Sequence, residues 1–373
     1  MNRPAEPTYA IVTGGGTAGH VLPAMAIAEA MVAAGHARAS VHYVGSLRGI
    51  EASLVPPTGF PMTLLPGRGI QRRLTVANVA AFGGLLVALA RSILLVRRLR
   101  PAVVVAVGGY ASVAIALAAA LWRVPVVVAE QNAVPGAANR LIARFARASA
   151  VSYEGTPLPR PVVTGNPIRA EIVAIATARD RAVARRAFGV GDGRHLLLVV
   201  GGSLGALRIN RALLDALPLW ADRRDLSIHH VVGARDWEDV LRSAPGDLGD
   251  LDYRPVRYED DMPGALAAAD VAVCRSGSST CFELAAVGLP SVLVPSPHVT
   301  ADQQTHNARP LADAGGAVVV PDAELDGPRL VREVEALLGD DDRRAAMARA
   351  AHAWARPDAA AAIAALAAEH ARV

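Results

Sequence analysis

Residues 271–295 have the sequence VAVCRSGSSTCFELAAVGLPSVLVP, and this stretch decides the fold class of the chain. A short apolar run at 271–274 meets a Ser/Gly-rich loop, then a run of helix formers that stops at Gly288, and finally a second apolar run after Pro290. The pattern predicts a strand, a loop, a helix and a strand in succession. This is the repeating unit of a parallel α/β sheet.

The loop at residues 275–279 is a candidate ligand site. It brings backbone N–H groups and the positive end of a helix to one place, which suits a phosphate or a sugar diol. Glu283, on the first turn, can accept two hydrogen bonds from a ribose diol; alternatively, Thr280 and Glu283 form a capping box that merely begins the helix. Polar residues beyond the next strand, Asp302-Gln303-Gln304 and Asn307, favour the ligand, because open α/β sheets bind ligands at the carboxyl ends of their strands.

Composition limits the classes of protein that the chain can belong to. With 373 residues and 52% hydrophobic content it can bury two α/β cores, so we expect two domains. Its two cysteines, Cys274 and Cys281, are too few for a disulfide scaffold or a zinc cluster, and we expect them in a reduced, cytoplasmic core without a metal site.

No membrane-spanning segment is expected. The N-terminal residues resemble neither a signal peptide nor an anchor, because Pro4, Glu6 and Pro7 precede the first apolar run. Residues 101–122 are long enough to cross a bilayer, but Gly108-Gly109 divides them into a strand and a helix. We therefore interpret them as a buried βα unit.

Charge is distributed unevenly along the chain. Residues 1–168 contain 15 arginines and 5 acids, whereas residues 169–373 contain 23 arginines and 29 acids, and lysine is absent. The arginine-rich half suits a polyanion or an anionic membrane surface. Nucleic acid is not an expected partner, because no helix-turn-helix, zinc-finger or aromatic RNA-binding signature accompanies the charge.

A glycine loop, GGGTAGH at residues 14–20, follows the first predicted strand at 9–12. It contains the dinucleotide-binding pattern G-x-G-x-x-G, but the second strand, at 41–46, ends without an acid, which disfavours NAD. His20 closes the loop. It can take a proton from an attacking hydroxyl, or it can simply hydrogen-bond the loop.

Further loops repeat this arrangement. The pair Gly108-Gly109 follows a strand, Glu130-Gln131-Asn132 ends another, and GGSLGA at 201–206 opens a second doubly wound domain, with Ser203 able to donate to a phosphate oxygen. We expect residues 165–169, GNPIR, to be a linker, because proline forces the preceding residue into an extended conformation.

Three charged features have two interpretations each. Arg169 can bind phosphate or simply be solvated. Asp260-Asp261 suggest a metal site, but their place before a helix favours dipole-stabilising caps. The apolar segment from Val76 to Leu89, flanked by Arg68, Arg72 and Arg73, is either a membrane-seating face or a core helix with a solvated basic end.

Two Rossmann-like halves, each beginning with a glycine loop, resemble a GT-B glycosyltransferase. Eight motifs extend this resemblance to the bacterial cell-wall enzymes that transfer N-acetylglucosamine from its UDP derivative to undecaprenyl-pyrophosphoryl-N-acetylmuramoyl-pentapeptide. In order, they are GGGTAGH (14–20), VGGY (107–110), EQN (130–132), GNPIR (165–169), GGSLGA (201–206), YEDDM (258–262), CRSGSSTCFE (274–283) and DQQTHN (302–307). The resemblance covers residues 9 to about 360.

The resemblance implies a set of contacts with the UDP-sugar donor. Glu283 would hold the ribose, the backbone at Glu259 the uracil, Ser203 with its loop the diphosphate, and Gln303 the sugar hydroxyls. The acceptor's pyrophosphate would face the first loop with Gly108, Gly109 and Tyr110. Leu204 replaces the family's usual glutamine, and Glu259 replaces a usually apolar residue. The implied donor contacts are Thr17, Ala18, Gly19, Asn132, Arg169, Ser203, Glu259, Ser278, Ser279, Thr280, Cys281, Phe282, Glu283 and Gln303.

The resemblance also implies a mechanism and a location. An inverting transfer would use His20 as the base, with UDP-N-acetylglucosamine as donor, no metal, and the enzyme peripheral on the cytoplasmic face of the membrane. Residues 1–166 would form the acceptor- and membrane-facing domain, with the helix at 357–373 packing back on it, and residues 167–356 would bind the UDP-sugar across a cleft. The alternatives are another GT-B enzyme, a UDP-sugar epimerase, or a nucleotide-binding protein without activity.

Overall fold

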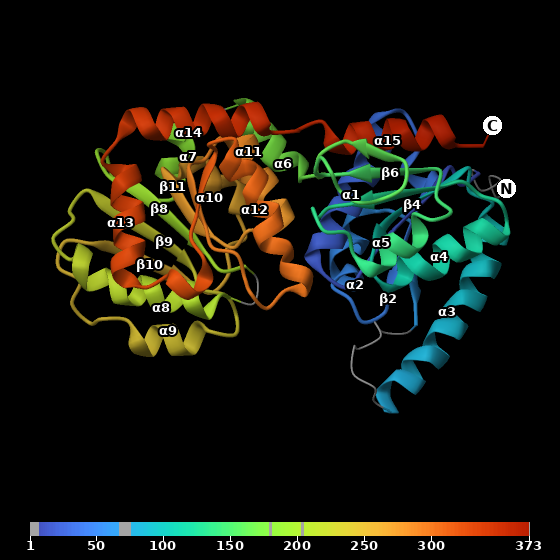
Figure 1. Cartoon of the computed structure of the whole chain (residues 1–373), viewed down its shortest axis with the longest axis horizontal. Coiled ribbons are helices and arrows are strands. Elements are labelled where there is room, and N and C mark those ends of the chain that lie inside the picture. The colour runs from blue at the N-terminus through green and yellow to red at the C-terminus, as the bar shows by residue number, and fades with distance from the viewer. Residues whose placement is uncertain (1–6, 67–75, 179–180, 203–204, 373) are drawn as a thin grey trace. The chain divides into compact units, whose positions relative to one another are not determined.

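The computed structural model describes residues 7–66, 76–178, 181–202 and 205–372, with the side chains of 76–83 and 177–178 left aside. The chain divides into two compact units. Met1–Arg169 and Arg356–Val373 form the first unit, and Ala170–Ala355 form the second. Figure 1 shows the elements of both.

The first unit is built on a seven-stranded parallel sheet of order β3-β2-β1-β4-β5-β6-β7. Valine-rich strands such as β4 and β5 are buried throughout, as expected for a parallel sheet covered on both faces. The strands are β1 (Ala10–Gly14), β2 (Val41–Ser46), β3 (Met62–Leu65), β4 (Val103–Gly108), β5 (Val126–Glu130), β6 (Ala148–Val151) and β7 (Pro161–Val163).

Alternate residues of these strands enter different hydrophobic cores. Val12 and Val105 pack toward α1 (Ala18–Ala33) and α15 (Ala359–His370). Their neighbours Ile11 and Val104 pack on the other face, toward α3 (Val76–Leu99) and α4 (Tyr110–Leu121). The C-terminal helix α15 thus contributes Ile363 and Leu366 to the core of the first unit, beside α1 (Figure 1).

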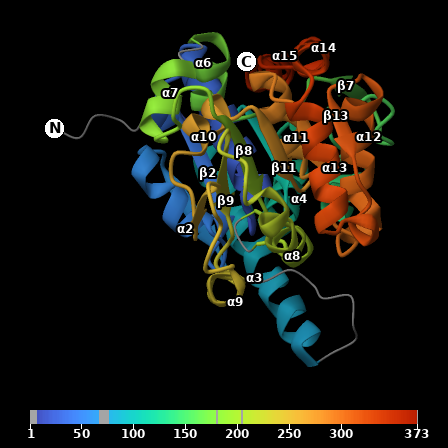
Figure 2. The ribbon, with the colours of Figure 1, turned by 90° about the vertical axis from the view of Figure 1, so that its left-hand side faces the viewer.

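The second unit has a six-stranded parallel sheet of order β10-β9-β8-β11-β12-β13. Leu197 and Val199 face a core that contains residues of α8 (Leu207–Ala216) and α13 (Gly327–Leu338), while α10 (Met262–Ala268) also contacts β8. Figure 2 shows these helices around the sheet. The strands are β8 (His195–Val200), β9 (Leu226–Val231), β10 (Asp252–Val256), β11 (Val271–Cys274), β12 (Ser291–Leu293) and β13 (Ala317–Val319).

The remaining helices connect the strands. They are α2 (Glu51–Leu54), α5 (Ala137–Ile142), α6 (Ala170–Ala178), α7 (Arg181–Ala187), α9 (Trp237–Ser243), α11 (Ser278–Val287), α12 (Gln303–Asp313) and α14 (Asp341–Trp354). Residues 101–122 form β4 and α4, as the glycine pair predicted. Among the described helices, none has the length and apolarity needed to cross a membrane.

Two features differ from the sequence-based expectation. The strand β3 and the short helix α2 were not expected, because four-residue elements carry too little periodicity to be recognised. The predicted linker is also more buried than expected, since residues 164–168 are buried. Gly165 has a left-handed φ of 86°, and a Cβ there would collide with the Arg356 side chain, so the segment packs tightly where the chain returns to the first unit.

Candidate active site

Each sheet has a point where its strand order reverses, and parallel sheets bind ligands at the carboxyl ends of the strands flanking such a point. In the first unit the reversal lies between β1 and β4, and in the second between β8 and β11. The first glycine loop and Gly108-Gly109 follow β1 and β4, whereas GGSLGA and the loop at 275–279 follow β8 and β11. The candidate residues therefore gather at the ligand-binding edge of each sheet.

Helix α1 presents its first turn at the end of β1. Thr17 is the N-cap in an extended conformation, and its carbonyl accepts hydrogen bonds from the N–H groups of His20 and Val21. The N–H groups of Ala18 and Gly19 have no acceptor among the described residues, so they can bind an anion. The exposed Thr17 hydroxyl lies 3.3 Å from Nδ1 of His20.

The His20 ring rests on the end of β4. A Cβ at Gly108 would lie 2.9 Å from Nε2 of His20, and Gly108 has a φ of 122°, so glycine is needed there for both space and conformation. Tyr110 begins α4 and donates its hydroxyl to the carbonyl of Pro66 over 3.1 Å. The structure therefore brings His20 and Gly108 into contact and places Gly109 and Tyr110 directly after them.

Two buried carboxylates lie near His20. Glu130, at the end of β5, accepts from the N–H groups of Asn132 and Gly136 and from the Asn139 amide, each over 2.9 Å. Glu51 accepts from the N–H groups of Ser46 and Gly16, over 2.5 and 3.1 Å. Sequence reasoning missed Glu51 altogether; its signal is the set of glycines that make room for it, including Gly45.

These surroundings set the pKa of His20 below its ordinary value. Burial of the ring lowers the pKa most, while the charges of Glu130 and Glu51 and a hydrogen bond to the Gly15 backbone act in the opposite direction. The imidazole is consequently neutral at neutral pH, and it has the carboxylates nearby that would stabilise it once protonated. This is the state that a general base requires.

Helix α11 begins earlier than the capping-box interpretation requires. Gly277 is its N-cap and Ser278 its first residue, so Thr280 lies inside the helix and the capping box is wrong. Ser279, Thr280 and Glu283 are half-buried at this end of the helix.

One face of α11 packs in the hydrophobic core. Cys281 and Phe282 are buried, and Phe282 packs on Trp354 with ring centroids 4.6 Å apart. These two side chains therefore hold α11 against the core. Burial raises the pKa of the Cys281 thiol, and it raises that of Cys274 to about 12, so both remain protonated.

Gln303 is the first residue of α12, and the next residue, Gln304, fixes this end of the helix. Gln304, which sequence reasoning gave no separate role, accepts a hydrogen bond from the Ser296 N–H with its side chain and from the Ser276 hydroxyl with its carbonyl, each over 2.8 Å. It thereby joins the loops that follow β11 and β12. Ala301 and Asp302 have left-handed φ values of 52° and 50°, a costly conformation of the kind that occurs at binding sites.

Glu259 turns its side chain toward the protein. Its carboxylate lies 2.8 Å from Nε2 of His229 and accepts from the Asp261 N–H over 2.7 Å. Asp261 in turn caps α10 by accepting from the Gly264 N–H, which confirms its interpretation as a helix cap. Arg169 and Asn132 are half-buried. Ser203 and Leu204 lie outside the described residues.

Sequence reasoning also missed a buried polar chain in the second unit. The Asn210 amide donates to the carbonyl of Val232 and to Asp236, and its oxygen lies 3.0 Å from His230, which contacts the Tyr253 hydroxyl at 2.8 Å. Burial lowers the pKa of His230 to about 3, so this histidine stays neutral. The chain joins α8 to β9 and β10 and supports the sheet edge.

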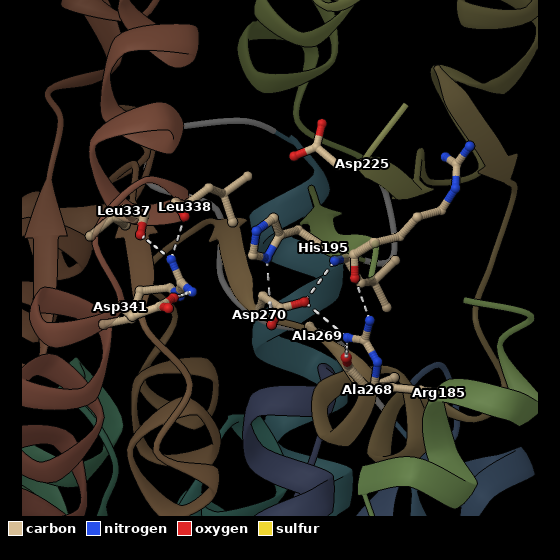
Figure 3. Close-up of polar contacts among 12 residues, drawn as sticks. Arg185, His195, Asp225, Ala268, Ala269, Asp270, Leu337, Leu338 and Asp341 are labelled. Atoms are coloured by element: carbon tan, nitrogen blue, oxygen red, sulfur yellow. Dashed lines mark hydrogen bonds and ion pairs between the residues drawn. The ribbon is translucent and has the colours of Figure 1, made fainter. Parts of the chain in front are cut away.

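A second polar cluster lies at the opposite, amino ends of the strands. Asp270 accepts from the Leu196 N–H and forms an ion pair with Arg181. It forms a second ion pair with Arg185 (Figure 3). Burial alone would raise the pKa of Asp270, but these partners lower it below its usual value. Asp270 thereby ties α7 to the start of β8.

No metal centre is evident in the described parts of the chain. No group of three or more His, Cys, Asp or Glu side chains there is arranged to hold an ion. The residues at the candidate site offer hydroxyls, amides, backbone N–H groups, one histidine, the Arg169 guanidinium and separate carboxylates such as Glu283.

Comparison with known proteins identifies the family. Residues 10–151 match the N-terminal domain of glycosyltransferase family 28, and residues 196–363 match its C-terminal domain. A protein of Desulforudis audaxviator is 38% identical over 93% of this chain and 94% of its own length, and one of Moorella thermoacetica is 42% identical over 94% and 95%. Both are named UDP-N-acetylglucosamine–N-acetylmuramyl-(pentapeptide) pyrophosphoryl-undecaprenol N-acetylglucosamine transferase.

Solved structures agree with this assignment. The crystal structure of MurG from Acinetobacter baumannii is 27% identical, with a TM-score of 0.76, and the match covers 97% of this chain and all of that one. A UDP-N-acetylglucosamine 2-epimerase from Neisseria meningitidis covers 95% of this chain and 98% of its own with a TM-score of 0.66, but at 13% identity it shows the fold alone. The fold is therefore GT-B, and the chain belongs to glycosyltransferase family 28, among the relatives that carry this transferase name.

Proposed function

We propose that this chain transfers N-acetylglucosamine from UDP-N-acetylglucosamine to the 4-hydroxyl of the muramoyl sugar in undecaprenyl-pyrophosphoryl-N-acetylmuramoyl-pentapeptide, with inversion to a β-1,4 bond. This is the step from lipid I to lipid II in peptidoglycan synthesis. The observation that carries the proposal is identity of 38–42% over 93–94% of the chain to transferases named for this donor and acceptor.

In this proposal His20 is the catalytic base. It takes the proton of the 4-hydroxyl as the oxygen attacks C1 of N-acetylglucosamine and the bond from C1 to the UDP oxygen breaks. Two observations support the role: the ring is neutral because burial lowers its pKa, and it lies at the start of α1 against Gly108. The N–H groups of Ala18 and Gly19, with Gly109 and Tyr110, would receive the acceptor's pyrophosphate.

The ribose, the uracil, the sugar hydroxyls and the diphosphate of the donor would each meet residues of the second unit. Glu283 would hold the ribose, Gln303 the sugar hydroxyls, and the Glu259 backbone the uracil, because the Glu259 carboxylate is already bound to His229 and Asp261. The diphosphate would lie at the start of α11, near Ser278, Ser279 and Thr280. The other donor residues would be Thr17, Ala18, Gly19, Asn132, Arg169 and Ser203, with Cys281 and Phe282 shaping the site from behind.

Leaving-group charge would be stabilised without a metal. The N-terminus of an α-helix carries a partial positive charge and unpaired N–H groups, and α11 begins at Ser278, shortly after the end of β11. Arg169 would add a full positive charge. We therefore propose that the transfer is independent of divalent cations.

The first unit would seat the enzyme on an anionic membrane at the cytoplasmic face, where the nucleotide sugar is available. Exposed apolar side chains lie on α3 from its middle onward and at the end of α4: Leu86, Val87, Leu94, Leu121 and Trp122. The Arg97 guanidinium lies 5.8 Å from the centre of the Trp122 ring, so basic and apolar groups meet there. Arg68, Arg72 and Arg73, which the sequence places beside this apolar segment, lie outside the described residues.

One assay tests the proposed function. UDP release is measured by a coupled reaction with UDP-N-acetylglucosamine, in the presence and absence of the lipid-linked muramoyl-pentapeptide. We expect release that requires the lipid acceptor. Release of UDP or formation of an epimer without the acceptor would indicate a UDP-sugar epimerase, and binding of the donor without UDP release would indicate a non-enzymatic nucleotide-binding protein.

A further inference from the structure

Glu51 is a buried acid that the proposed chemistry does not use. It begins the four-residue helix α2, its side chain is fully buried, and it forms no ion pair with any described residue. Burying a carboxylate without a cation is costly, and the cost is usually met by hydrogen bonds from N–H groups. Here the donors are the backbones of Ser46, at the end of β2, and Gly16, in the first glycine loop.

Three glycines make room for this one side chain. A Cβ at Gly15, Gly45 or Gly49 would overlap the Glu51 side chain. In a dinucleotide-binding fold, an acid after the second strand faces the ribose of the ligand. Here the acid is five residues beyond that strand and is directed at the glycine loop itself, 35 residues away in the sequence.

The glycine loop links Glu51 to His20 indirectly. Gly16 donates to the carboxylate, and the backbone of the adjacent Gly15 forms a hydrogen bond with the His20 ring. The charged or titratable groups that act on the ring are Glu51 from α2 and Glu130 from β5, while Thr17 and Gly108 contact it as neutral groups. Tyr43 of β2 donates its hydroxyl to the Gly14 carbonyl, and burial raises its pKa, so it stays neutral.

We propose that Glu51 is a positioning residue for the transfer. It fixes the glycine loop that precedes His20, and it places a negative charge near the His20 ring, which becomes an imidazolium in the reaction. The inference rests on the proposed role of His20 as base. When His20 takes the proton of the acceptor hydroxyl, the positive charge that appears on the ring is stabilised by Glu51 and Glu130. The proton is released to solvent after UDP and the product leave.

The test compares Glu51→Gln, which keeps the shape and removes the charge, with Glu29→Gln, which removes the charge of a half-buried acid paired with Arg38 on the same unit. For Glu51→Gln we expect kcat to fall about tenfold or more, KM for UDP-N-acetylglucosamine to stay within about twofold, and the acid limb of the kcat–pH profile to move to lower pH. The limb moves down because a histidine without a neighbouring negative charge has a lower pKa. Glu29→Gln should change none of these.

A purely structural role would lower the fraction of active enzyme without moving the acid limb, so an unmoved limb overturns the electrostatic part of the inference. Titration of His20 by NMR in the two variants measures the same shift without turnover. Glu51→Asp keeps the charge but withdraws it from the loop; it should lower kcat and leave the limb nearer its original place, and unchanged kcat would overturn the positioning part. This variant also decides the matter if Glu51→Gln does not fold.

The proposed base is tested separately by His20→Ala. If that variant keeps its turnover, the base assignment fails, and Glu51 loses its catalytic partner. If it loses turnover while Glu51→Gln behaves like the original enzyme, the base assignment stands and the inference about Glu51 fails alone. In the His20→Ala background, adding Glu51→Gln should cost little more, because the two residues act as a unit.

Discussion

The two units share a fold but present different chemistry at the equivalent edge of the sheet. In the first unit, the carboxyl ends of the strands carry groups that titrate: His20 on α1 and the buried acids Glu51 and Glu130. In the second unit, the equivalent edge carries hydroxyls and amides around the starts of α11 and α12, such as Thr280 and Gln303, with the acid Glu283.

This difference assigns separate tasks to the units. A group that moves a proton needs a pKa set by burial and by neighbouring charges, and the first unit supplies both. A site that binds a nucleotide sugar needs hydrogen-bond donors and acceptors, and the second unit offers hydroxyls, amides and the Glu283 side chain. Under the proposed function, one parallel sheet would support proton transfer and the other would support recognition of the nucleotide sugar.

The largest expected effect comes from removing the proton acceptor of the first unit. His20→Ala should lower kcat by about 10²–10⁴-fold, the usual contribution of a general base. KM for UDP-N-acetylglucosamine should change little, because His20 is not among the proposed donor contacts. Steady-state kinetics with varied donor measures both constants. A large rise in KM with unchanged kcat would show that His20 binds the donor and is not the base.

Truncating Glu283 in the second unit should have the opposite effect: UDP affinity should fall while kcat changes less. Glu283→Ala should weaken UDP binding by about 10–100-fold, since hydrogen bonds to a charged group contribute about 1.5–3 kcal/mol. Turnover at saturating donor should fall much less than in His20→Ala. Calorimetric titration with UDP measures the affinity, and Asp326→Ala, which removes a distant cap of α13, serves as the control. Unaltered UDP affinity would disprove the ribose contact.

Acid should destabilise both units through their buried histidines. The pKa is about 3 for His230 in the second unit and about 4 for His42 in the first, both lowered mainly by burial. The unfolded chain binds these protons near pH 6.5, so stability is complete above that pH and falls as pH decreases toward the folded values. Each histidine should contribute about 1.4 kcal/mol of lost stability per pH unit inside its window.

Denaturant unfolding at pH 7 and pH 5 measures this effect. The difference in unfolding free energy between the two pH values should shrink in His230→Asn and in His42→Asn, and each variant should act on the transition of its own unit. Equal pH sensitivity in the original protein and in both variants would show that other groups control acid stability.

Membrane seating should depend on the first unit alone. Leu94→Glu replaces a leucine that is 65% exposed on α3, and we expect a fall of several-fold in co-sedimentation with anionic liposomes, because both apolar contact and charge attraction are weakened. Leu219→Glu, at a leucine 57% exposed in the second unit, is the matched control. A similar loss in the two variants, or binding insensitive to salt and anionic lipid, would argue against a seating face on α3 and α4.

The smallest expected effect is that of chelation. If helix N-termini and Arg169 stabilise the departing diphosphate, EDTA should leave the rate of lipid-dependent UDP release unchanged. Turnover that disappears with EDTA and returns with a divalent cation would show that the second unit lacks a charge that the reaction requires.

The order of the elements was predictable from the sequence because its signals are local. Valine runs, glycine loops and apolar helices follow one another within about 20 residues, and they correctly indicated two parallel sheets covered on both faces. The eight motifs indicated the family for the same reason, since each is short and their order is preserved along the chain. Local patterns also predicted the cap at Asp261 and the division of residues 101–122 into β4 and α4.

Tertiary structure alone decided how distant residues meet at the site. Glu51 bonds to Gly16 across 35 residues, Gln304 bonds to Ser276 across 28, and His230 reaches Tyr253 across 23. No periodicity or spacing encodes such contacts, because they depend on which strands become neighbours in the sheet. The contact between Phe282 of α11 and Trp354 of α14 depends on the tertiary structure in the same way.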